Sequence, residues 1–465
     1  MAGPMTTTPA LETRHPVDFE PSWLGQQTYL SRRRPMKIDA AVVLSVTICL
    51  LTLIPSRLVL PGLTGLGRPA MVLAIMTVAW WILVKLSPRL VMRGRQPIRW
   101  IALLLLVDML VSYAVGYGRG LTMMEANSAD RWMLQAAAMC GLMLLASDGI
   151  SNWERLKAVL KAFVWCAAFM AVVGVLQSFL ALDITTYFVI PGLREGAEAA
   201  DIVARGGGIR VASTATHYIE FSVVMALALP FGIHFAAFAP TSKARQTYWA
   251  LAGLIAIAIP LTISRTGIIC AVLAMLVVAS VWTWRLRYNL FVIALVFGAV
   301  LAGTKPSLVG TLLWMFTGAS EDPSITSRTD RYQMVLDFFV QRPWFGRGTG
   351  TWVWPQYQYL DNQWFATALE NGIVGVAALA SLHICAIVLV AVAWRRSKTA
   401  ADRHLAAALM STQITAIAAS ATFDSLSFTT YVVLIAILVG LCGAVWRLTH
   451  PERLVRTASV SVGKI

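Results

Sequence analysis

The sequence predicts an all-α protein that crosses a membrane about twelve times, and two observations lead to this fold class. First, 58% of the 465 residues are hydrophobic and only 13% are charged, whereas a soluble chain is about 45–50% apolar and about 25% charged. Second, the apolar residues form runs such as AAVVLSVTICLLTLI and YVVLIAILVGLCGAVW, which approach the roughly 18 residues of a membrane-spanning helix. With a mean hydropathy of +0.69, an ordinary soluble protein is excluded.

Twelve apolar segments qualify as spans with a window of about 19 residues. They lie at 38–58, 69–87, 98–118, 131–148, 156–181, 215–239, 246–263, 267–284, 287–303, 362–394, 404–421 and 429–447. The segments that this arrangement places inside carry 25 of the 38 Lys and Arg residues, so both termini are predicted to be cytoplasmic. The net charge of +15 is then explained by basic inner loops, and no nucleic-acid partner is expected.

The spans divide the chain into five parts. These are a cytoplasmic tail at 1–37, transmembrane helices 1–9 at 38–303 with an exterior loop at 182–214, a large exterior loop at 304–361 between helices 9 and 10, transmembrane helices 10–12 at 362–447, and a cytoplasmic tail at 448–465. The first tail is polar and lacks an early apolar core, so we expect it to be disordered and not a cleavable signal peptide. The large loop is rich in Trp and Tyr, and we expect it to fold into an exterior cap with short helices.

The six cysteines all fall within apolar runs, and none forms a C-x-x-C motif. They are expected to be small core residues, with neither a disulfide framework nor a zinc site.

A helix is predicted within the large loop, in the segment SITSRTDRYQMVLDFFVQRP. Ser327 and Asp330 form a pair like a capping box at its start. Tyr332, Leu336 and Phe339 recur at i, i+4 and i+7. One apolar face of this helix is therefore expected to lie on the bundle.

Two arginines occupy the first turn of this helix. Arg328 and Arg331 are i, i+3 neighbours, so both guanidinium groups emerge on one side. The free N–H groups and the positive end of the helix dipole lie at the same turn, and guanidinium forks match phosphate oxygens. The pair is predicted to bind a diphosphate. The alternative is a solvated basic turn, or arginines that contact lipid headgroups.

The segment PWFGRGTGTW follows the helix. Its glycines, Gly346, Gly348 and Gly350, permit tight turns and a close approach of the backbone. The spacing is not that of a dinucleotide-binding fingerprint, and a Walker A lysine is missing. The glycines are therefore predicted to position the loop.

Three polar residues stand where the chain re-enters the membrane. Asp361 and Asn362 are good helix N-caps. Asp361, at the mouth of a span beside an arginine-bearing loop, is also suited to general-base chemistry. Glu370 lies eight residues beyond Asn362, or about 12 Å deeper by helical rise, where a carboxylate is expected to face the bundle interior.

A second polar group gathers at the outer mouth of the sixth predicted span. It contains Arg210, His217 and Glu220, of which the last two are i, i+3 neighbours on one helix face. These two residues could act as acid and base, or they could cap and stabilise the span. Asp108, within the third span, is an intramembrane ionisable residue whose partner the sequence does not identify.

The string SRTDRYQMVLDFFVQRPWFGRGTGTW…LDNQWFATALENGIVGVAAL resembles the signature region of the O-antigen ligase and polymerase superfamily. That family has an arginine before an aromatic helix, then P-x-x-G-x-G, then (H/D)-N near a membrane re-entry, then E-x-G-x-x-G. The specific resemblance covers 325–380, and the twelve-span layout with its large exterior loop is also similar. ISRTG at 263–267 is similar to the family's Ser-Arg-[Ser/Thr] element.

The resemblance implies a GT-C-like bundle that transfers a glycan from a polyprenyl (undecaprenyl) diphosphate to an acceptor hydroxyl at the outer membrane face, without a metal or cofactor. Arg328, or Arg331 in an alternative alignment, would hold the diphosphate together with Arg265. Taken alone, Arg265 could instead snorkel to lipid headgroups. Ligases have a histidine where this sequence has Asp361, a form associated more with polymerase-like members. A carboxylate can take a hydroxyl proton as a histidine would.

We therefore predict a metal-independent, inverting membrane glycosyltransferase of cell-surface polysaccharide synthesis in the cytoplasmic membrane, a polymerase in preference to a ligase. Its predicted partners are a polyprenyl-diphosphate-linked glycan, a glycan, lipid or protein acceptor, membrane lipids and other envelope assembly proteins. The predicted site residues are Asp361, His217 and Glu370 for catalysis, Arg328, Arg331, Arg265 and Arg210 for the diphosphate, and Gly346, Gly348 and Asn362 for positioning. The alternative is a secondary transporter or a lipid-linked glycan flippase.

Overall fold

The structure is a computed structural model. It describes the residue ranges 38–63, 66–86, 95–196, 204–205, 208–318 and 331–451. The predicted tail at 1–37 and almost all of the tail at 448–465 lie outside these ranges.

The described residues form fourteen α-helices, which confirms the all-α fold class. They are α2 (Ala40–Leu53), α3 (Pro69–Leu86), α4 (Pro97–Gly118), α5 (Met123–Gly149), α6 (Trp153–Leu180), α7 (Tyr218–Ala237), α8 (Ser242–Leu261), α9 (Arg265–Ala279), α10 (Trp284–Thr304), α11 (Pro306–Thr317), α13 (Arg331–Phe339), α14 (Gln363–Arg396), α15 (Ala400–Ser420) and α16 (Thr429–Leu448). A helix stands at each predicted span. Seven of them, α3, α4, α6, α7, α10, α14 and α16, are long and apolar enough to cross a membrane. The protein is therefore a multi-pass membrane protein, and the total of twelve spans stays a prediction.

Helix α5 begins eight residues before the predicted span at 131–148 because a capping box starts it. The Thr122 hydroxyl accepts a hydrogen bond from the Glu125 backbone N–H (3.3 Å), and the Glu125 carboxylate accepts one from the Thr122 N–H (3.0 Å). This reciprocal pair satisfies two backbone donors that the first helical turn leaves without partners.

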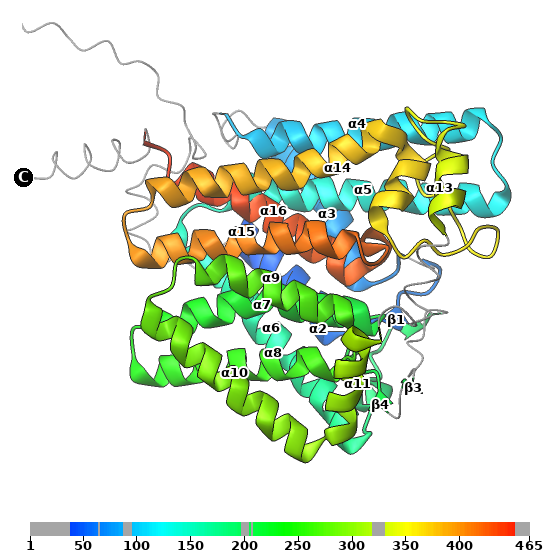
Figure 1. The fold of residues 1–465 in the computed structure, drawn as a ribbon. Coiled ribbons are helices and arrows are strands. Elements are labelled where there is room, and N and C mark those ends of the chain that lie inside the picture. The colour runs from blue at the N-terminus through cyan, green and yellow to red at the C-terminus, as the bar shows by residue number, and fades with distance from the viewer. Residues whose placement is uncertain are drawn as a thin grey trace, which may run out of the picture.

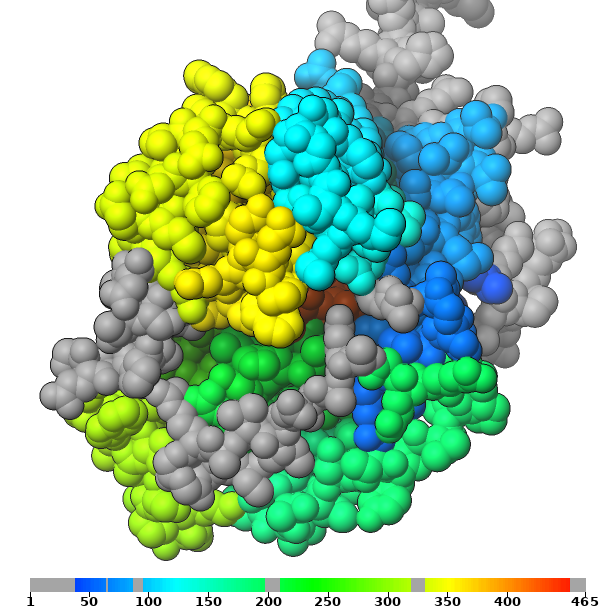
Figure 2. Space-filling model, turned by 90° about the vertical axis from the view of Figure 1, so that its right-hand side faces the viewer, coloured from blue at the N-terminus to red at the C-terminus, as the bar shows by residue number. Residues whose placement is uncertain are grey.

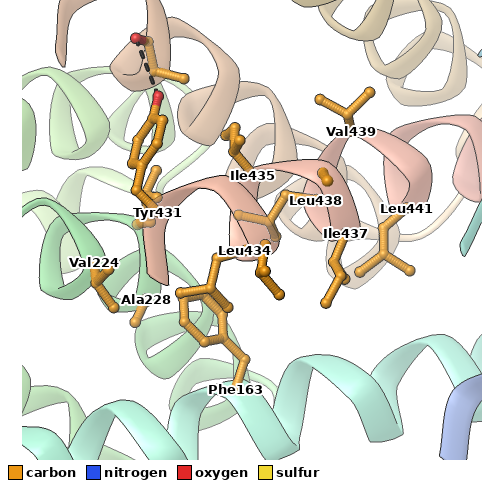
Figure 3. Packing of buried hydrophobic residues seen from close by; sticks show 14 of the residues in the cluster. Phe163, Val224, Ala228, Tyr431, Leu434, Ile435, Ile437, Leu438, Val439 and Leu441 are labelled. Carbon is orange, nitrogen blue, oxygen red and sulfur yellow. Dashed lines mark hydrogen bonds between the residues drawn. The ribbon is translucent and has the colours of Figure 1, made fainter. Parts of the chain in front are cut away.

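Two helices, α7 and α16, form the centre of the bundle, and both are almost entirely buried. Helix α16 packs on α5 and α14, while α7 packs on α8 and α9. Figure 3 shows Phe163 of α6 directed toward Leu434 of α16, beside Val224 and Ala228 of α7. The six cysteines are free thiols, four of them buried, as expected for core residues.

One end of the bundle carries the loops, and we name it the cap end (Figure 1, right). Helix α13 and the following residues to 361, which we name the cap, lie there together with two short antiparallel ladders. Strand β1 (Leu58–Val59) pairs with β2 (Arg194–Glu195), which joins the loop after α2 to the loop after α6. Strands β3 (Ala204–Arg205) and β4 (Gly208–Ile209) form a hairpin.

The apolar face predicted for the helix in the large loop is partly wrong. Tyr332 and Leu336 are 54% and 52% exposed. The buried residue of α13 is instead Val335, which forms a small cluster with Leu360 and Leu369. Leu360 and Leu369 decide which side of α13 is buried. The periodicity of residues within one helix does not reveal such neighbours.

The sequence predicts one continuous helix at 362–394, whereas the structure has two helical parts there. Gly372 within α14 has φ 68° and ψ −163°, so the helix is broken there. Glycine adopts such a backbone conformation without the steric cost that a side chain would add.

Candidate functional site

At the cap end, the N-termini of four helices, α7, α9, α14 and α16, lie close to one another. Glu220, in the first turn of α7, accepts a hydrogen bond from the Thr430 N–H at the start of α16 (2.7 Å). Gly267, in the first turn of α9, packs directly against Ser222 of α7. Since each helix N-terminus is the positive end of a helix dipole, this region favours an anionic ligand. Figure 2 views this end and shows a surface hollowed along its middle, between the yellow cap and the green segments below it.

The cap joins α14 at Asp361, which lies in this region. The Asp361 carboxylate forms an ion pair with Arg331, at 3.1 Å between Oδ2 and Nη1. Asp361 stays 45% exposed in this pair, while Arg331 is 17% exposed. Its backbone has φ 51°, a left-handed conformation that a non-glycine residue adopts only when its surroundings hold it.

Asp424, just before α16, holds this backbone in place. Its carboxylate accepts hydrogen bonds from the N–H groups of Asp361 (3.2 Å) and Asn362 (2.9 Å). Burial raises the pKa of Asp424 to about 6, and the negative charge of Asp361 acts in the same direction, while the hydrogen bond from Asn362 opposes them. We name Arg331, Asp361, Asn362 and Asp424 the entrance cluster.

The sequence analysis missed Asp424, although one signal pointed to it. Asp424 is the sole ionisable residue in the short connection between the last two predicted spans. A single acidic residue at the same end of the bundle as Asp361 was a candidate member of the site.

Asn362 caps α14, as predicted. Its side-chain oxygen accepts hydrogen bonds from the N–H groups of Trp364 (3.0 Å) and Phe365 (3.3 Å). This bond pattern fixes the first turn of α14 directly after Asp361.

His217 and Glu220 each cap a helix. The His217 Nδ1 atom accepts a hydrogen bond from the Ile219 N–H at the start of α7 (3.3 Å). Burial and the charge of Arg210 lower the pKa of His217 to about 4, and the charge of Asp361 opposes this shift. Because its Nδ1 lone pair is engaged, His217 is less suited than Asp361 to accept a proton from a substrate. Glu220 is buried and caps α16 through the Thr430 N–H.

The remaining predicted arginines differ in what the structure shows of them. Arg265 is the first residue of α9, and Ser264 caps that helix through the Gly267 N–H (3.3 Å). Arg210 lies over the Tyr218 ring at 4.3 Å and donates to its hydroxyl. Arg265 therefore begins a helix at the cap end and Arg210 contacts the start of another, whereas Arg328 lies outside the described residues.

Residues 343–351, which we name the plug, enter the bundle between α4 and α14. A Cβ atom on Gly346 would lie 2.3 Å from the backbone of Glu370, and one on Gly348 would lie 2.7 Å from the Cα of Gly116. Both glycines also have positive φ, 67° and 125°. These two positions require glycine because the plug packs backbone against backbone.

The plug supplies hydrogen bonds to the broken part of α14. The Ile373 N–H donates to the Pro343 carbonyl (2.8 Å), and the Arg347 N–H donates to the Leu369 carbonyl (2.9 Å). The groups that lose their helical partners at Gly372 are thus satisfied from outside the helix. Within a membrane protein such a break is tolerated only under this condition.

Glu370 lies behind the plug and is buried, and its carboxylate is directed to the backbone of the cap. It is 6% exposed, and its carboxylate accepts a hydrogen bond from the Trp352 N–H (3.0 Å). Its carbonyl accepts one from the Ser112 hydroxyl (2.7 Å). The neighbouring Asn371 donates to Asp108 (3.0 Å), which names the partner that the sequence did not identify. These contacts tie α14 to α4 and the cap, and they favour a positioning role for Glu370.

The cap is hydrogen-bonded to both members of an ion pair in the turn between α4 and α5. Arg119 and Glu125 are 2.5 Å apart, and Glu125 is buried. Arg119 also donates to the Arg347 carbonyl (2.7 Å), and Tyr357 donates to Glu125 (3.4 Å). The site therefore rests on a cap that is bonded to both α4–α5 and α14.

Residues 250–380 match the family model described as O-antigen ligase. The match spans 131 of the 465 residues and includes Arg265, Arg331, the plug, Asp361 and Glu370. It confirms the resemblance to the O-antigen ligase and polymerase superfamily. No curated protein matches the chain.

Proposed function

We propose that this protein transfers a glycan from a polyprenyl diphosphate to an acceptor hydroxyl, with the cap end at the outer face of the cytoplasmic membrane. The observation that supports this most is the Arg331–Asp361 ion pair at 3.1 Å, in a region where four helix N-termini meet. It joins a phosphate-binding group and a candidate base at one place. The match to the O-antigen ligase model gives the reaction class.

The donor diphosphate would bind to the arginines of the cap end. Arg331 is presented by the cap, Arg265 is the first residue of α9, and Arg210 contacts Tyr218, the first residue of α7. Guanidinium groups match phosphate oxygens in geometry and charge, and the helix dipoles add to the attraction. Arg328, three residues before Arg331 in sequence, is proposed as a further ligand. No metal is needed for charge neutralisation in this arrangement.

Asp361 would act as the general base. The acceptor oxygen attacks the anomeric carbon, its proton passes to Asp361, and the bond from that carbon to the diphosphate oxygen breaks. The arginines stabilise the negative charge that develops on the leaving diphosphate. Attack from the side opposite the leaving group inverts the anomeric centre, and a product that retains the donor configuration would exclude this mechanism.

The Arg331–Asp361 ion pair connects donor binding with proton transfer from the acceptor. In the absence of donor, Arg331 neutralises Asp361. A bound diphosphate carries more negative charge than one carboxylate and competes for the same guanidinium. Donor binding would then release Asp361 for the acceptor proton.

We favour a polymerase over a ligase because an aspartate precedes Asn362. A transporter or flippase of lipid-linked glycans is the rival function. A carrier has no need of a cap bonded to three helices, or of a base paired with a phosphate-binding residue.

The test measures polyprenyl-diphosphate-linked glycans in cells that lack the protein and express a variant. Arg331→Ala and Asp361→Ala should both leave glycans on the outer leaflet, as single repeat units for a polymerase or as long chains for a ligase. The matched controls are Arg342→Ala and Asp337→Ala, exposed residues of the same cap. Accumulation on the inner leaflet would identify a flippase, and full clearance by both variants would refute the transferase.

A further inference from the structure

The cap residues 352–359 direct their aromatic side chains to two different sides. Trp352 and Tyr357 stack on each other at 4.4 Å between ring centroids, with 21° between the planes. Phe338 of α13 meets the Trp352 ring edge-on at 5.2 Å. These three half-buried rings pack against one another within the cap.

The other two rings face outward. Trp354 and Tyr359 are nearly parallel, with 9° between their planes and 6.0 Å between centroids. Each is 59% exposed. Large aromatic surfaces left in contact with solvent side by side mark a binding surface more often than single exposed residues do.

The backbone that presents these two rings is held by side chains. The Trp352 indole N–H donates to the Gln358 carbonyl (2.8 Å). Arg347 donates to the Tyr357 hydroxyl (2.8 Å), and its guanidinium lies 5.0 Å from the Phe338 ring. The pair is therefore held in place before any ligand binds, which lowers the entropic cost of binding.

The outward pair lies beside the candidate base. Tyr359 precedes Asp361 by two residues, so their Cα atoms are at most about 7 Å apart. Leu360 between them is 2% exposed and packs inward. A ligand on the Tyr359 ring would thus reach the entrance cluster.

We propose that Trp354 and Tyr359 form a stacking platform for a pyranose ring of the glycan, next to the linkage that is made. This inference rests on the proposed function. A pyranose has an apolar face of C–H groups, which packs on an aromatic face, while its hydroxyls stay hydrated or bonded to polar neighbours. The residues around the platform, Gln356, Gln358 and Asp361, are polar and suit a hydroxyl-rich ligand better than lipid chains.

The test uses the full chain in lipid nanodiscs and lipid-linked glycans extracted from cells that lack the protein. Initial rates against glycan concentration are measured for Trp354→Ala, Tyr359→Ala and the ring-preserving Trp354→Phe. A stacking contact predicts about a tenfold rise in KM for either alanine variant, with kcat within about twofold of wild type, and recovery in Trp354→Phe. Tyr187→Ala, which removes a 75% exposed ring from another loop of the cap end, is the matched control.

An unchanged KM in both alanine variants would overturn the platform. An equal rise in Tyr187→Ala would also overturn it, because the effect would then reflect membrane contact by exposed rings. Retention of the extracted glycans on purified protein is measured in parallel. If wild type retains glycan but transfers none, and Trp354→Ala weakens retention about tenfold, the platform stands while the proposed function fails.

Discussion

Asp361 of the entrance cluster follows the plug by ten residues of sequence, yet the cluster and the plug differ in composition and burial. The entrance cluster consists of three ionisable side chains and the amide of Asn362 near the surface, and its Asp361 is 45% exposed. The plug is backbone in a protein interior, where Gly348 packs against Gly116 and the Glu370 side chain is buried. One part of the chain that carries the motifs thus lies at the surface with ionisable side chains, and the other part packs inside the protein.

The difference in exposure indicates which carboxylate is a candidate for catalysis. Asp361 can exchange its partner Arg331 for a ligand because both reach the surface. Glu370 cannot, since the Trp352 N–H and the packed plug enclose it. Both carboxylates lie in motifs of the family, but Asp361 is a candidate base, whereas Glu370 is a hydrogen-bond acceptor with a positioning role.

The largest effect is expected from breaking the plug. Gly346→Ala would place a Cβ atom 2.3 Å from the Glu370 backbone at a residue with φ 67°. Overpacking and backbone strain each cost about 1–3 kcal/mol, so much of the folded protein should be lost. Membrane abundance and thermal unfolding measure this. Gly310→Ala in α11, where nothing lies within 4 Å, should leave membrane abundance and thermal unfolding unchanged. Equal losses in the two variants would contradict the close packing of the plug at Gly346.

The next effect concerns chemistry without loss of fold. Asp361→Asn keeps the size of the side chain but removes the base, so turnover should fall by about 10²–10⁴-fold. Thermal stability should change little, because the residue is half exposed and surface ion pairs contribute about 0–1 kcal/mol. Glycan-transfer rates and unfolding curves are compared with those of Asp337→Asn. Turnover near that of wild type would remove Asp361 as the base.

A smaller effect tests whether Glu370 positions the cap. Glu370→Ala should lower the free energy of unfolding by about 1–3 kcal/mol, because it leaves the half-buried Trp352 N–H without its acceptor. Glu370→Gln keeps an oxygen at that position and should retain most of the turnover. Chemical unfolding and transfer assays distinguish the two variants. Loss of turnover in Glu370→Gln at unchanged stability would instead assign a catalytic role.

The smallest effect is a pH dependence set by Asp424, whose pKa is raised to about 6. Below this pH the carboxyl is protonated and accepts the N–H bonds of Asp361 and Asn362 less strongly. Turnover should therefore rise as the pH increases through about 6. Asp424→Asn cannot titrate, so its pH profile should lack this inflection; an inflection that persists in the variant would assign it to another group.

Sequence reasoning predicted the helices and the location of the candidate site. Apolar runs placed every predicted span on a helix, and Asp361, Asn362 and Arg331 were singled out from local chemistry. It did not predict the break at Gly372 or the exposed side of α13. In both cases residues distant in sequence decide the outcome: Pro343 supplies a hydrogen bond beyond the break, and Leu360 and Leu369 cover Val335.

By itself, the sequence determined the membrane class, because burying apolar runs in lipid depends on composition and length alone. It also determined which groups can bind phosphate or take a proton, since these are properties of single side chains. Only the tertiary structure decided that Asp424 holds Asp361, that Glu370 is enclosed, and that Trp354 and Tyr359 face outward together. Each of these is a contact between segments, and its geometry arises when the plug and the helix N-termini pack at one end of the bundle.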